Sequence, residues 1–336
     1  MDFGVLLTDI PTLLVVILGV PAVLMAYIVG AEFLVRRLPD KNRPQVRPWI
    51  WVGPALAFVA AFLFIPAVAT LFQSFEDNHG GFIGLQNYAN QLGGFPGGAW
   101  IAIRNSIIVW LILYMILVLA FGLIMAVLFD RVQYETVVKS LIFMPMAISS
   151  VASAVIWKFM YWYQPVGAPQ TGTLNAFITT LHHDPVAWLQ DTWPGTIALL
   201  NNFALILVAT WGITGFSMVI LSAALKGIPG ELLEAARVDG AGEITIFRRV
   251  IFPLMMPTIV VVATTLVIFA IKVFDVPYVM TNGLFNTDVL ALRMYNLLYL
   301  SHNNGAASAV AIVLLIAVIP VLVFNIRQFR AVEARR

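Results

Sequence analysis

The stretch "EAARVDGAGEITIFRRVIFP", residues 234 to 253, is a charged, glycine-punctuated segment between two of the most hydrophobic parts of the chain. Each apolar neighbour runs for about 20 residues, which is the length of helix that crosses the hydrocarbon core of a bilayer. Six charged side chains stand together in the segment: Glu234, Arg237, Asp239, Glu243, Arg248 and Arg249. This alternation predicts a helical membrane protein in which the charged segment is a loop in water.

The composition supports the same class of protein. Of the 336 residues, 61% are hydrophobic and 11% are charged, and the mean hydropathy is +0.92, whereas roughly a quarter of the residues of a soluble domain are charged. The formal net charge of +2 is too small to indicate binding to nucleic acid. The chain has no cysteine, which excludes disulfides, thiolate metal sites and cysteine nucleophiles. We therefore expect an integral membrane protein surrounded by the lipid bilayer, with no nucleic-acid partner.

Apolar windows long enough to span a bilayer recur along the chain. They predict seven transmembrane helices, at about 11–31, 49–72, 105–129, 137–160, 200–224, 257–279 and 306–326. Open sheets cannot cross lipid, and these runs are too long and too continuously apolar for barrel strands, so the predicted fold class is all-α and polytopic. The first run follows acidic rather than basic residues, which predicts a retained span and not a secretory signal. We expect residues 1–48 to form an amino-terminal helix with a basic linker, and residues 49–336 to form the core.

The basic residues predict the orientation of the spans. They gather in alternate connections: Arg36, Arg37, Lys41, Arg43 and Arg47 in the first, Arg131 and Lys139 in the third, Lys226, Arg237, Arg248 and Arg249 in the fifth, and Arg327, Arg330, Arg335 and Arg336 in the tail. The other three connections together hold only Arg104 and Arg293. Connections rich in Lys and Arg stay on the cytoplasmic side. The pattern predicts an outside amino terminus, a cytoplasmic carboxyl terminus and a cytoplasmic loop at 226–256.

Within that loop, the residues predict two short helices. Pro229 suits a first helical turn, the glutamates that follow it favour the positive end of the helix dipole, and the Asp-Gly pair at 239–240 supplies a stop. A second helix is expected from about Glu243 to a break at Pro253. A compact helix with one small apolar face can enter a cleft on a partner. The alternative is a solvated loop that merely joins two spans.

The loop also resembles a known family. "EAARVDGA", in which Gly240 is followed by nine residues and then by "VIFP", is similar to the EAA signature in the membrane subunits of ATP-binding-cassette importers. In that signature a Glu-Ala-Ala is followed three residues on by a glycine and later by Ile-x-Leu-Pro. Here Val250 replaces the isoleucine and Phe252 replaces the leucine, and both replacements are apolar.

Other segments resemble the sugar-permease branch of the same family, which includes maltose, glycerol-phosphate and alpha-glucoside permeases. They are "GFIGLQNYANQL" at 81–92, "IFMPMAISSVASAVIWKFMY" at 142–161, "GFSMVILSAALKGIPGELLEAARVDGA" at 215–241 and "FDVPYVMTNG" at 274–283. Together these segments span most of residues 49–330. The chain departs from the family after Gly283, where "LFNTDVLALRMY" replaces a turn rich in glycine and proline.

The resemblance implies a type I importer permease fold (MetI-like) and a translocation subunit of an ATP-driven, binding-protein-dependent importer in the bacterial inner membrane. The implied substrate is an oligosaccharide or an alpha-glucoside-like solute. The implied partners are ATPase subunits, which bind ATP and Mg²⁺, a second homologous permease, and a periplasmic or lipid-anchored solute-binding protein. The residues that would dock on the ATPase are Glu234, Ala235, Ala236, Asp239 and Gly240.

The sequence itself contains no pattern for ATP hydrolysis. A phosphate-binding loop ends in Gly-Lys-Ser/Thr, but the only lysine followed by serine or threonine is Lys139, and "QYETVV" precedes it. The four histidines, at 79, 182, 183 and 302, have no metal-ligand spacing. We therefore expect a non-catalytic chain without cofactor or metal. Its energy would come from a partner chain or, alternatively, from an ion gradient in a secondary transporter that works without an ATPase.

Polar side chains within the spans are candidates for a substrate pathway. Lys272 and Asp275 are three residues apart and are expected on one side of the sixth span, where they either pair or snorkel at the interface, or line the pathway. In an ion-coupled transporter they would be the coupling pair. Further candidates, which could offer hydrogen bonds and aromatic faces to a sugar, are Asn201, Asn202, Trp211, Thr214, Ser217 and Tyr278. Aromatic residues near span ends are also common as interfacial anchors.

Overall fold

The structure is a computed structural model that describes residues 3–93, 98–130, 132–190 and 200–333. These residues form helices and turns, with an isolated β-bridge between Glu76 and Phe82, which confirms the predicted all-α class. The chain divides into two compact units, Met1–Ala69 and Thr70–Arg336. The boundary expected after residue 48 stays a prediction. Arg131, Arg335 and Arg336, which count in the predicted orientation, lie outside the described residues.

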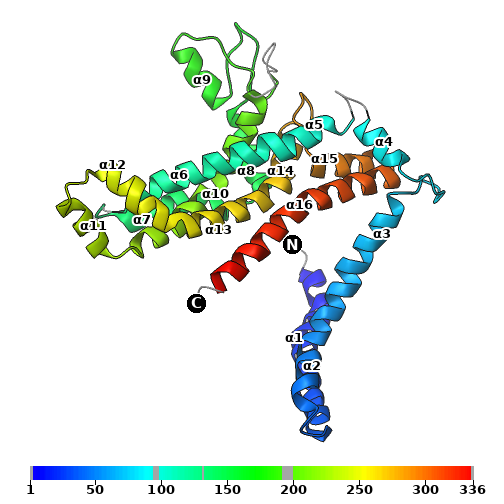
Figure 1. The fold of residues 1–336 in the computed structure, drawn as a ribbon. Helices are drawn as coiled ribbons and strands as arrows, with labels where there is room; N and C mark the ends of the chain where they lie inside the picture. The colour runs from blue at the N-terminus through cyan, green and yellow to red at the C-terminus, as the bar shows by residue number, and fades with distance from the viewer. Residues whose placement is uncertain (1–2, 94–97, 131, 191–199, 334–336) are drawn as a thin grey trace. The chain divides into compact units, whose positions relative to one another are not determined.

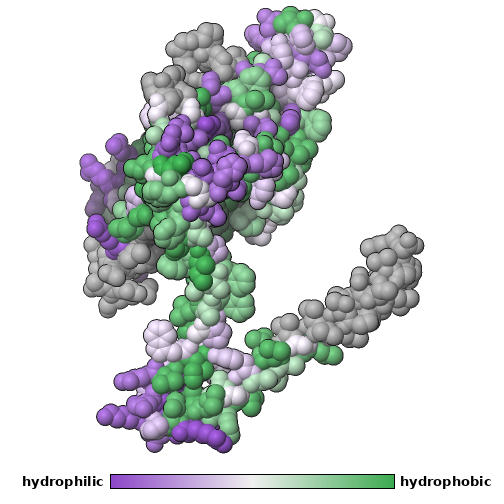
Figure 2. All heavy atoms as spheres, turned by 90° about the vertical axis from the view of Figure 1, so that its right-hand side faces the viewer, coloured by the Kyte–Doolittle hydropathy of each residue, from purple (hydrophilic) through white to green (hydrophobic). Residues whose placement is uncertain are grey.

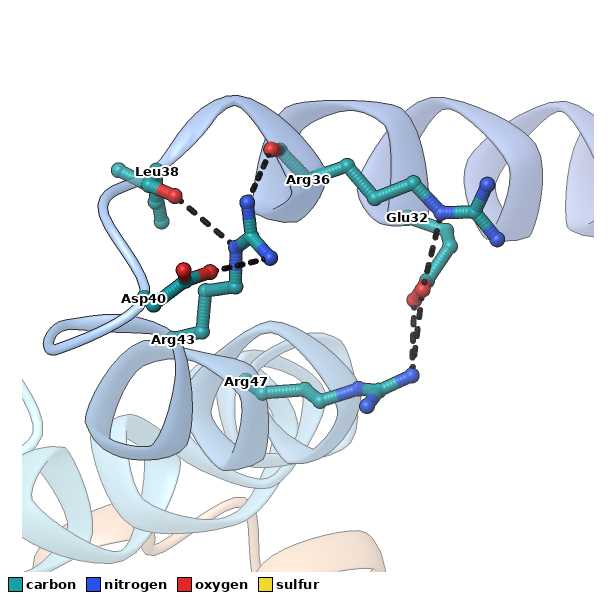
Figure 3. A network of polar contacts seen from close by, with 6 residues as sticks. All are labelled: Glu32, Arg36, Leu38, Asp40, Arg43 and Arg47. Carbon is teal, nitrogen blue, oxygen red and sulfur yellow. Dashed lines mark hydrogen bonds and ion pairs between the residues drawn. The ribbon is translucent and has the colours of Figure 1, made fainter.

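The first unit is a helical hairpin. α1 (Phe3–Arg37) and α2 (Arg43–Val59) are joined by the short basic linker, and a π-helical segment (Ala60–Phe64) leads from α2 into α3 (Ile65–Gln73). At the linker, the Glu32 carboxylate lies 3.5 Å from Arg36 Nε and 3.1 Å from Arg47 Nη2 (Figure 3). These two ion pairs connect α1 to itself and to α2, and so they fix the closed end of the hairpin.

Most described side chains of the hairpin face outward. Ala31 and Val35 are buried, whereas α2 buries none of its side chains and Phe58 is 66% exposed. Figure 2 shows hydrophilic atoms gathered at the linker end of the hairpin and hydrophobic atoms along its helices. A helix that is apolar over its whole surface matches the lipid interior rather than water. The hairpin therefore provides two apolar spans that end in a charged linker.

The second unit holds the core. Its helices are α4 (Gln86–Leu92), α5 (Trp100–Ile103), α6 (Met115–Leu128), α7 (Glu135–Phe143), α8 (Ser150–Met160), α9 (Thr173–Thr180), α10 (Leu200–Lys226), α11 (Gly230–Val238), α12 (Glu243–Ile246), α13 (Phe252–Ile271), α14 (Asp275–Met280), α15 (Leu290–Tyr295) and α16 (Asn304–Glu333) (Figure 1). π-helical segments cover Arg104–Tyr114, Phe247–Ile251 and Asn296–Leu300, and a 3-10 turn covers Met144–Ala147. α10 is central and packs against α6, α7 and α13.

Two glycines bring helices unusually close to each other. A Cβ added at Gly122 on α6 would lie 2.7 Å from the Cβ of Ser217 on α10. A Cβ added at Gly215 on α10 would lie 2.6 Å from the Cα of Phe143 and 2.7 Å from the carbonyl oxygen of Ile142, both on α7. Small residues let helix backbones approach closely in membranes. α6, α7 and α10 therefore form a tight group at the centre of the unit.

The predicted spans are confirmed with one exception. Within the described residues, six helical segments are long and apolar enough to cross a membrane: Ile17–Arg37, Arg43–Gln73, Trp100–Leu128, Leu200–Lys226, Glu243–Met280 and Asn304–Val321. The exception is the window at 137–160, which was expected to be one span. It is a pair of segments, Glu135–Ala147 and Ser150–Met160, bent by 98°.

Two further expectations about helix ends are wrong. The helix that begins at Glu243 does not break at Pro253, because the π-helical turn over Phe247–Ile251 precedes the proline and the helix continues as α13. Wide turns of this kind accommodate a residue that cannot join the regular ladder. In contrast, the sixth span does break, between Ile271 and Asp275. Lys272 and Asp275 are therefore not held on one face of a continuous helix.

Candidate functional site

The two unexpected helix breaks border the same cavity. This cavity, of about 410 Å³, is lined by Trp110, Tyr114, Pro145, Met146, Ile148, Ser150, Ser153, Val208, Ala209, Gly212, Ile213, Phe269, Ala270, Lys272, Val273, Phe274, Asp275 and Val276. Non-helical backbone at membrane depth is tolerated where it is buried in protein or lines a cavity. We call this space the first cavity. Its walls combine aromatic rings with a few polar groups, which is typical of a site for a small molecule.

The first break follows from its local sequence. Pro145 lies in the 3-10 turn that ends α7, and Ile148 is extended, with φ −85° and ψ 135°. Ser149 then caps α8, because its Oγ accepts a hydrogen bond from the Ala152 N–H at 3.2 Å. The segment thus ends one helix and starts another within a few residues. The sequence does contain the signal for this break, which is Pro145 followed by the helix-capping Ser149. Hydropathy alone did not reveal it, because both residues lie within an apolar window of span length.

The second break places two predicted residues on the cavity. Lys272 and Asp275 both line it, the lysine exposed and the aspartate half-buried. Among the ion pairs of the described residues, none joins Lys272 to Asp275. Both residues thus line a cavity without an ion pair between them, and snorkelling at the interface and lining of the pathway both stay predictions. The role of either residue in a pathway stays a prediction.

Tyr278 lies on a second cavity, of about 340 Å³, which also includes Trp162, Tyr163 and Asn282. Its ring stacks on that of Phe274, with centroids 5.1 Å apart and an interplanar angle of 15°. Because Phe274 lines the first cavity and Tyr278 lines the second, this stacked pair connects a wall residue of one cavity to a wall residue of the other.

The candidate residues on α10 make contacts within the protein. Trp211 packs edge-on against Trp157 at 5.7 Å between ring centroids, and Thr214 donates a hydrogen bond to the Thr210 carbonyl at 2.7 Å. Ser217 is fully buried in the contact with Gly122. These contacts place the three side chains in helix packing, and their assignment to a pathway stays a prediction.

Asn201 and Asn202 are fully buried and hold a distant turn. The Asn201 amide donates to the carbonyl of Phe285, and the Asn202 amide donates to that of Asn286 at 3.3 Å. Asn105 also donates to the Asn286 carbonyl, at 2.7 Å. Phe285 and Asn286 both have positive φ, and these amides satisfy the carbonyl groups of that strained turn. In this structure, the two candidate asparagines therefore support the backbone.

Sequence reasoning missed part of the first cavity. Trp110 and Tyr114 come from the third span, Gly212 from α10 and Phe269 from α13. All four lie inside apolar windows. Hydropathy does not distinguish a residue that lines a cavity from one that is packed in the core. Only the two aromatic side chains one helical turn apart, at 110 and 114, offered a signal.

The loop at 226–256 has a well-defined turn. α11 ends at Val238, and Gly240 has φ +78°. The N–H of Ala241 donates to the Ala236 carbonyl at 3.0 Å, and the N–H of Gly240 donates to the Arg237 carbonyl at 3.0 Å. This pair of bonds around a left-handed residue is the Schellman motif, which glycine favours because it has no Cβ. The predicted stop at 239–240 is thereby confirmed.

Most side chains of α11 are exposed. The helix fully buries none of them, and Val238 is 88% exposed. Ile244, just beyond the turn, is 77% exposed. Among the predicted docking residues, four are exposed and Ala236 is half-buried. A helix with uncovered apolar side chains and a fixed turn has the form of a knob that another surface can cover.

Comparison with known proteins gives one family and several relatives. The family model described as "Binding-protein-dependent transport system inner membrane component" matches residues 118–335. The osmoprotective compounds uptake permease protein GgtC of Synechocystis is 45% identical over 288 residues, which cover 85% of this chain and 100% of that protein. The alpha-glucoside transport system permease protein AglF of Rhizobium meliloti is 42% identical over 286 residues, which cover 84% of this chain and 82% of that protein.

A solved structure has the same fold. One chain in the crystal structure of a bacterial ABC transporter involved in the import of the acidic polysaccharide alginate aligns with a TM-score of 0.70 and 21% identity. The alignment covers 87% of this chain and 98% of that chain.

Proposed function

Because this chain belongs to the family of binding-protein-dependent transport system inner membrane components, we propose that it forms part of the path by which a carbohydrate enters the cell, driven by a separate ATPase. It is a multi-pass membrane protein and a transport subunit. The observation that carries the proposal is α11, which buries none of its side chains in its own chain and ends in a fixed turn. An exposed structure of this kind needs a partner surface.

The proposed substrate is an oligosaccharide or an alpha-glucoside-like solute. Support comes from the first cavity, where Trp110, Tyr114 and Phe274 offer aromatic rings and Ser153 and Asp275 offer polar groups. Aromatic faces pack against the C–H faces of a sugar, while polar groups bond its hydroxyls. The names of the two relatives, an osmoprotective compounds permease and an alpha-glucoside permease, support a solute of this kind.

The proposed partner of α11 is a cytoplasmic ATPase that binds ATP and Mg²⁺. Ala235 and Ala236 would allow close approach, and Glu234 would meet a basic group on the ATPase. The remaining proposed partners are a second, homologous permease and a solute-binding protein outside the membrane. The amino terminus would lie outside and the carboxyl terminus inside, as the basic residues predict.

The test begins with purification of the chain from its native cells in mild detergent, followed by mass spectrometry of the proteins that come with it. We expect an ATPase and a second permease in the wild type, and loss of the ATPase in Ala235→Trp. The matched control is Ala168→Trp in the exposed 165–169 segment, far along the chain from α11. Equal loss of the ATPase in both variants would contradict a specific role for α11.

Transport is then measured in liposomes with radiolabelled sucrose, maltose and trehalose. The chain, assembled with its proposed ATPase, second permease and solute-binding protein, should take up at least one of these three sugars only when ATP is supplied. Uptake by the purified chain alone, driven by an ion gradient, would instead favour a secondary transporter. Lys272→Gln and Asp275→Asn would then be the first variants to measure, since these residues would be its coupling pair.

A further inference from the structure

We propose that Glu135 and Lys226 form a positioning pair that carries movement of α11 to the wall of the first cavity. The inference rests on the proposed docking of α11 to an ATPase. It adds the physical connection between the docking helix and the cavity, which comes from side-chain contacts between the start of α7 and the end of α10.

The pair belongs to a small polar cluster. Lys226 is the last residue of α10, and its Nζ lies 2.6 Å from Oε1 and 2.9 Å from Oε2 of Glu135, the first residue of α7. Lys139, one turn further along α7, pairs with Glu135 and also donates to the Ser222 hydroxyl on α10. We call these four residues the Glu135 cluster. It joins the two helices by two side-chain links, one from Glu135 to Lys226 and one from Lys139 to Ser222.

The cluster is partly removed from water. The side chains of Glu135 and Lys139 are 21% and 15% exposed, and Ser222 is buried. Lys226 is 52% exposed. Ion pairs that are partly buried are screened less by salt than fully exposed pairs, and hydrogen bonds between charged groups are stronger than neutral ones. Glu135 and Lys139 therefore make a firmer ion pair than an ordinary surface pair, and Lys226 joins them from a more exposed position.

On one side, the cluster lies next to α11. Residues 227–229 join Lys226 to α11, and this connection is itself hydrogen-bonded. The Gly227 N–H lies 3.1 Å from the Ala223 carbonyl, and the Ile228 N–H lies 3.2 Å from the Leu225 carbonyl. A turn that is this short and hydrogen-bonded in this way can change its conformation only a little. A displacement of α11 must therefore reach Lys226.

On the other side, the cluster leads to the cavity. α7 runs from Glu135 to Phe143 and continues into the turn at Met144–Ala147, where Pro145 and Met146 line the first cavity. At 1.5 Å per residue, Glu135 and Pro145 are about 15 Å apart. The far end of α7 is also held, because Gly215 of α10 touches its backbone. α7 is thus fixed to α10 at both ends, and the cavity wall must follow α10.

The variant that separates this role from simple stabilisation is Lys226→Gln, because Glu135 keeps its pair with Lys139. The matched control is Lys226→Arg, which keeps the charge. Each variant is assembled in liposomes with the proposed ATPase, second permease and solute-binding protein. Uptake of whichever of the three sugars the wild-type complex transports is then measured together with ATP hydrolysis. We expect Lys226→Gln to lower the uptake per ATP hydrolysed by about fivefold or more, with the melting temperature nearly unchanged. Lys226→Arg should resemble the wild type.

A second pair of variants tests the connection itself. If Glu135 and Lys226 act through each other, the double variant Glu135→Gln/Lys226→Gln should be no worse than Glu135→Gln alone. Multiplied effects would overturn the inference, and so would normal uptake per ATP in Lys226→Gln. If Glu135→Gln fails to fold, the comparison of Lys226→Gln with Lys226→Arg decides alone. A wild-type complex that shows no ATP-dependent uptake would overturn the proposed function itself, which is a different result.

Discussion

α10 and α11 are neighbours in sequence, separated only by residues 227–229, yet their environments are opposite. Half of the most apolar window of α10 is buried in the chain, whereas α11 has no fully buried side chain and only Leu233 and Ala236 are half-buried. The sequence of α10 is therefore constrained by packing inside this protein. The sequence of α11 is instead constrained by the partner protein that we propose covers this helix. Substitutions in the two helices should accordingly have different effects. Those in α10 should affect folding, and those in α11 should affect binding to the partner protein.

The largest effect is expected from Gly215→Val on α10. The added side chain would collide with the backbone of α7 at Ile142 and Phe143, which cannot rotate away. Overpacking of this kind costs about 1–3 kcal/mol, so the melting temperature in mild detergent should fall clearly. The control is Gly212→Ala on the same helix, where an added Cβ meets nothing within 4 Å. Equal melting temperatures for the two variants would remove the packing argument for α10.

Gly240→Ala should have a smaller effect on stability but a large one on transport. The alanine must adopt φ +78°, which costs about 1 kcal/mol, and the turn that ends α11 would shift. We expect ATP-dependent uptake to fall by about fivefold or more, with only a slight change in melting temperature.

Gly80→Ala is the matched control for this prediction. Gly80 has φ +80° and, like Gly240, an added Cβ there meets nothing within 4 Å. It lies in the 73–104 connection, away from α11 in sequence. Both alanines should cost similar stability, whereas only the one at Gly240 should impair uptake. If the two variants lost uptake equally, the contrast between α11 and the rest of the chain would be broken.

The smallest effect is expected from Glu32→Gln in the hairpin. Glu32 pairs with Arg36 and Arg47, whose side chains are 76% and 56% exposed. Exposed pairs contribute about 0.2–1 kcal/mol, and salt should abolish that contribution. Melting temperatures at low and high salt check this expectation. A large, salt-independent loss would show that exposed polar groups in this protein can be as important to folding as its packed glycines.

The spans were predictable because an apolar run of about 20 residues rarely occurs in a protein unless it crosses a membrane. The break at 144–149 was not predicted, because hydropathy reports side-chain polarity and the residues of that turn are mostly apolar. The opposite error occurred at Pro253, where a proline suggested a break and a π-helical turn absorbed it. Local rules identify residues that disturb a helix, but the packing around them decides whether the helix bends or continues.

The candidate site was only partly predictable for a related reason. The turn at 239–240 was predicted because all its determinants are local. Asn201 was assigned by its polarity to a pathway, yet its amide reaches the carbonyl of Phe285, which lies on a distant part of the chain. A single sequence carries no record of such long-range pairing. Polar residues in a membrane helix can therefore satisfy a remote backbone as well as a ligand.

The hydrogen-bonded turn after α11 has a consequence for inhibitors. α11 and its turn are already ordered in the free chain. Binding to a partner therefore does not have to offset the loss of conformational entropy that ordering them would cost. A peptide copied from residues 229–243 would lack the flanking spans, and isolated helices of such length are marginal in water. Such a peptide should compete poorly with the intact protein. A cyclised version that holds the turn at Gly240 should compete better, because covalent closure would replace the membrane helices as the scaffold.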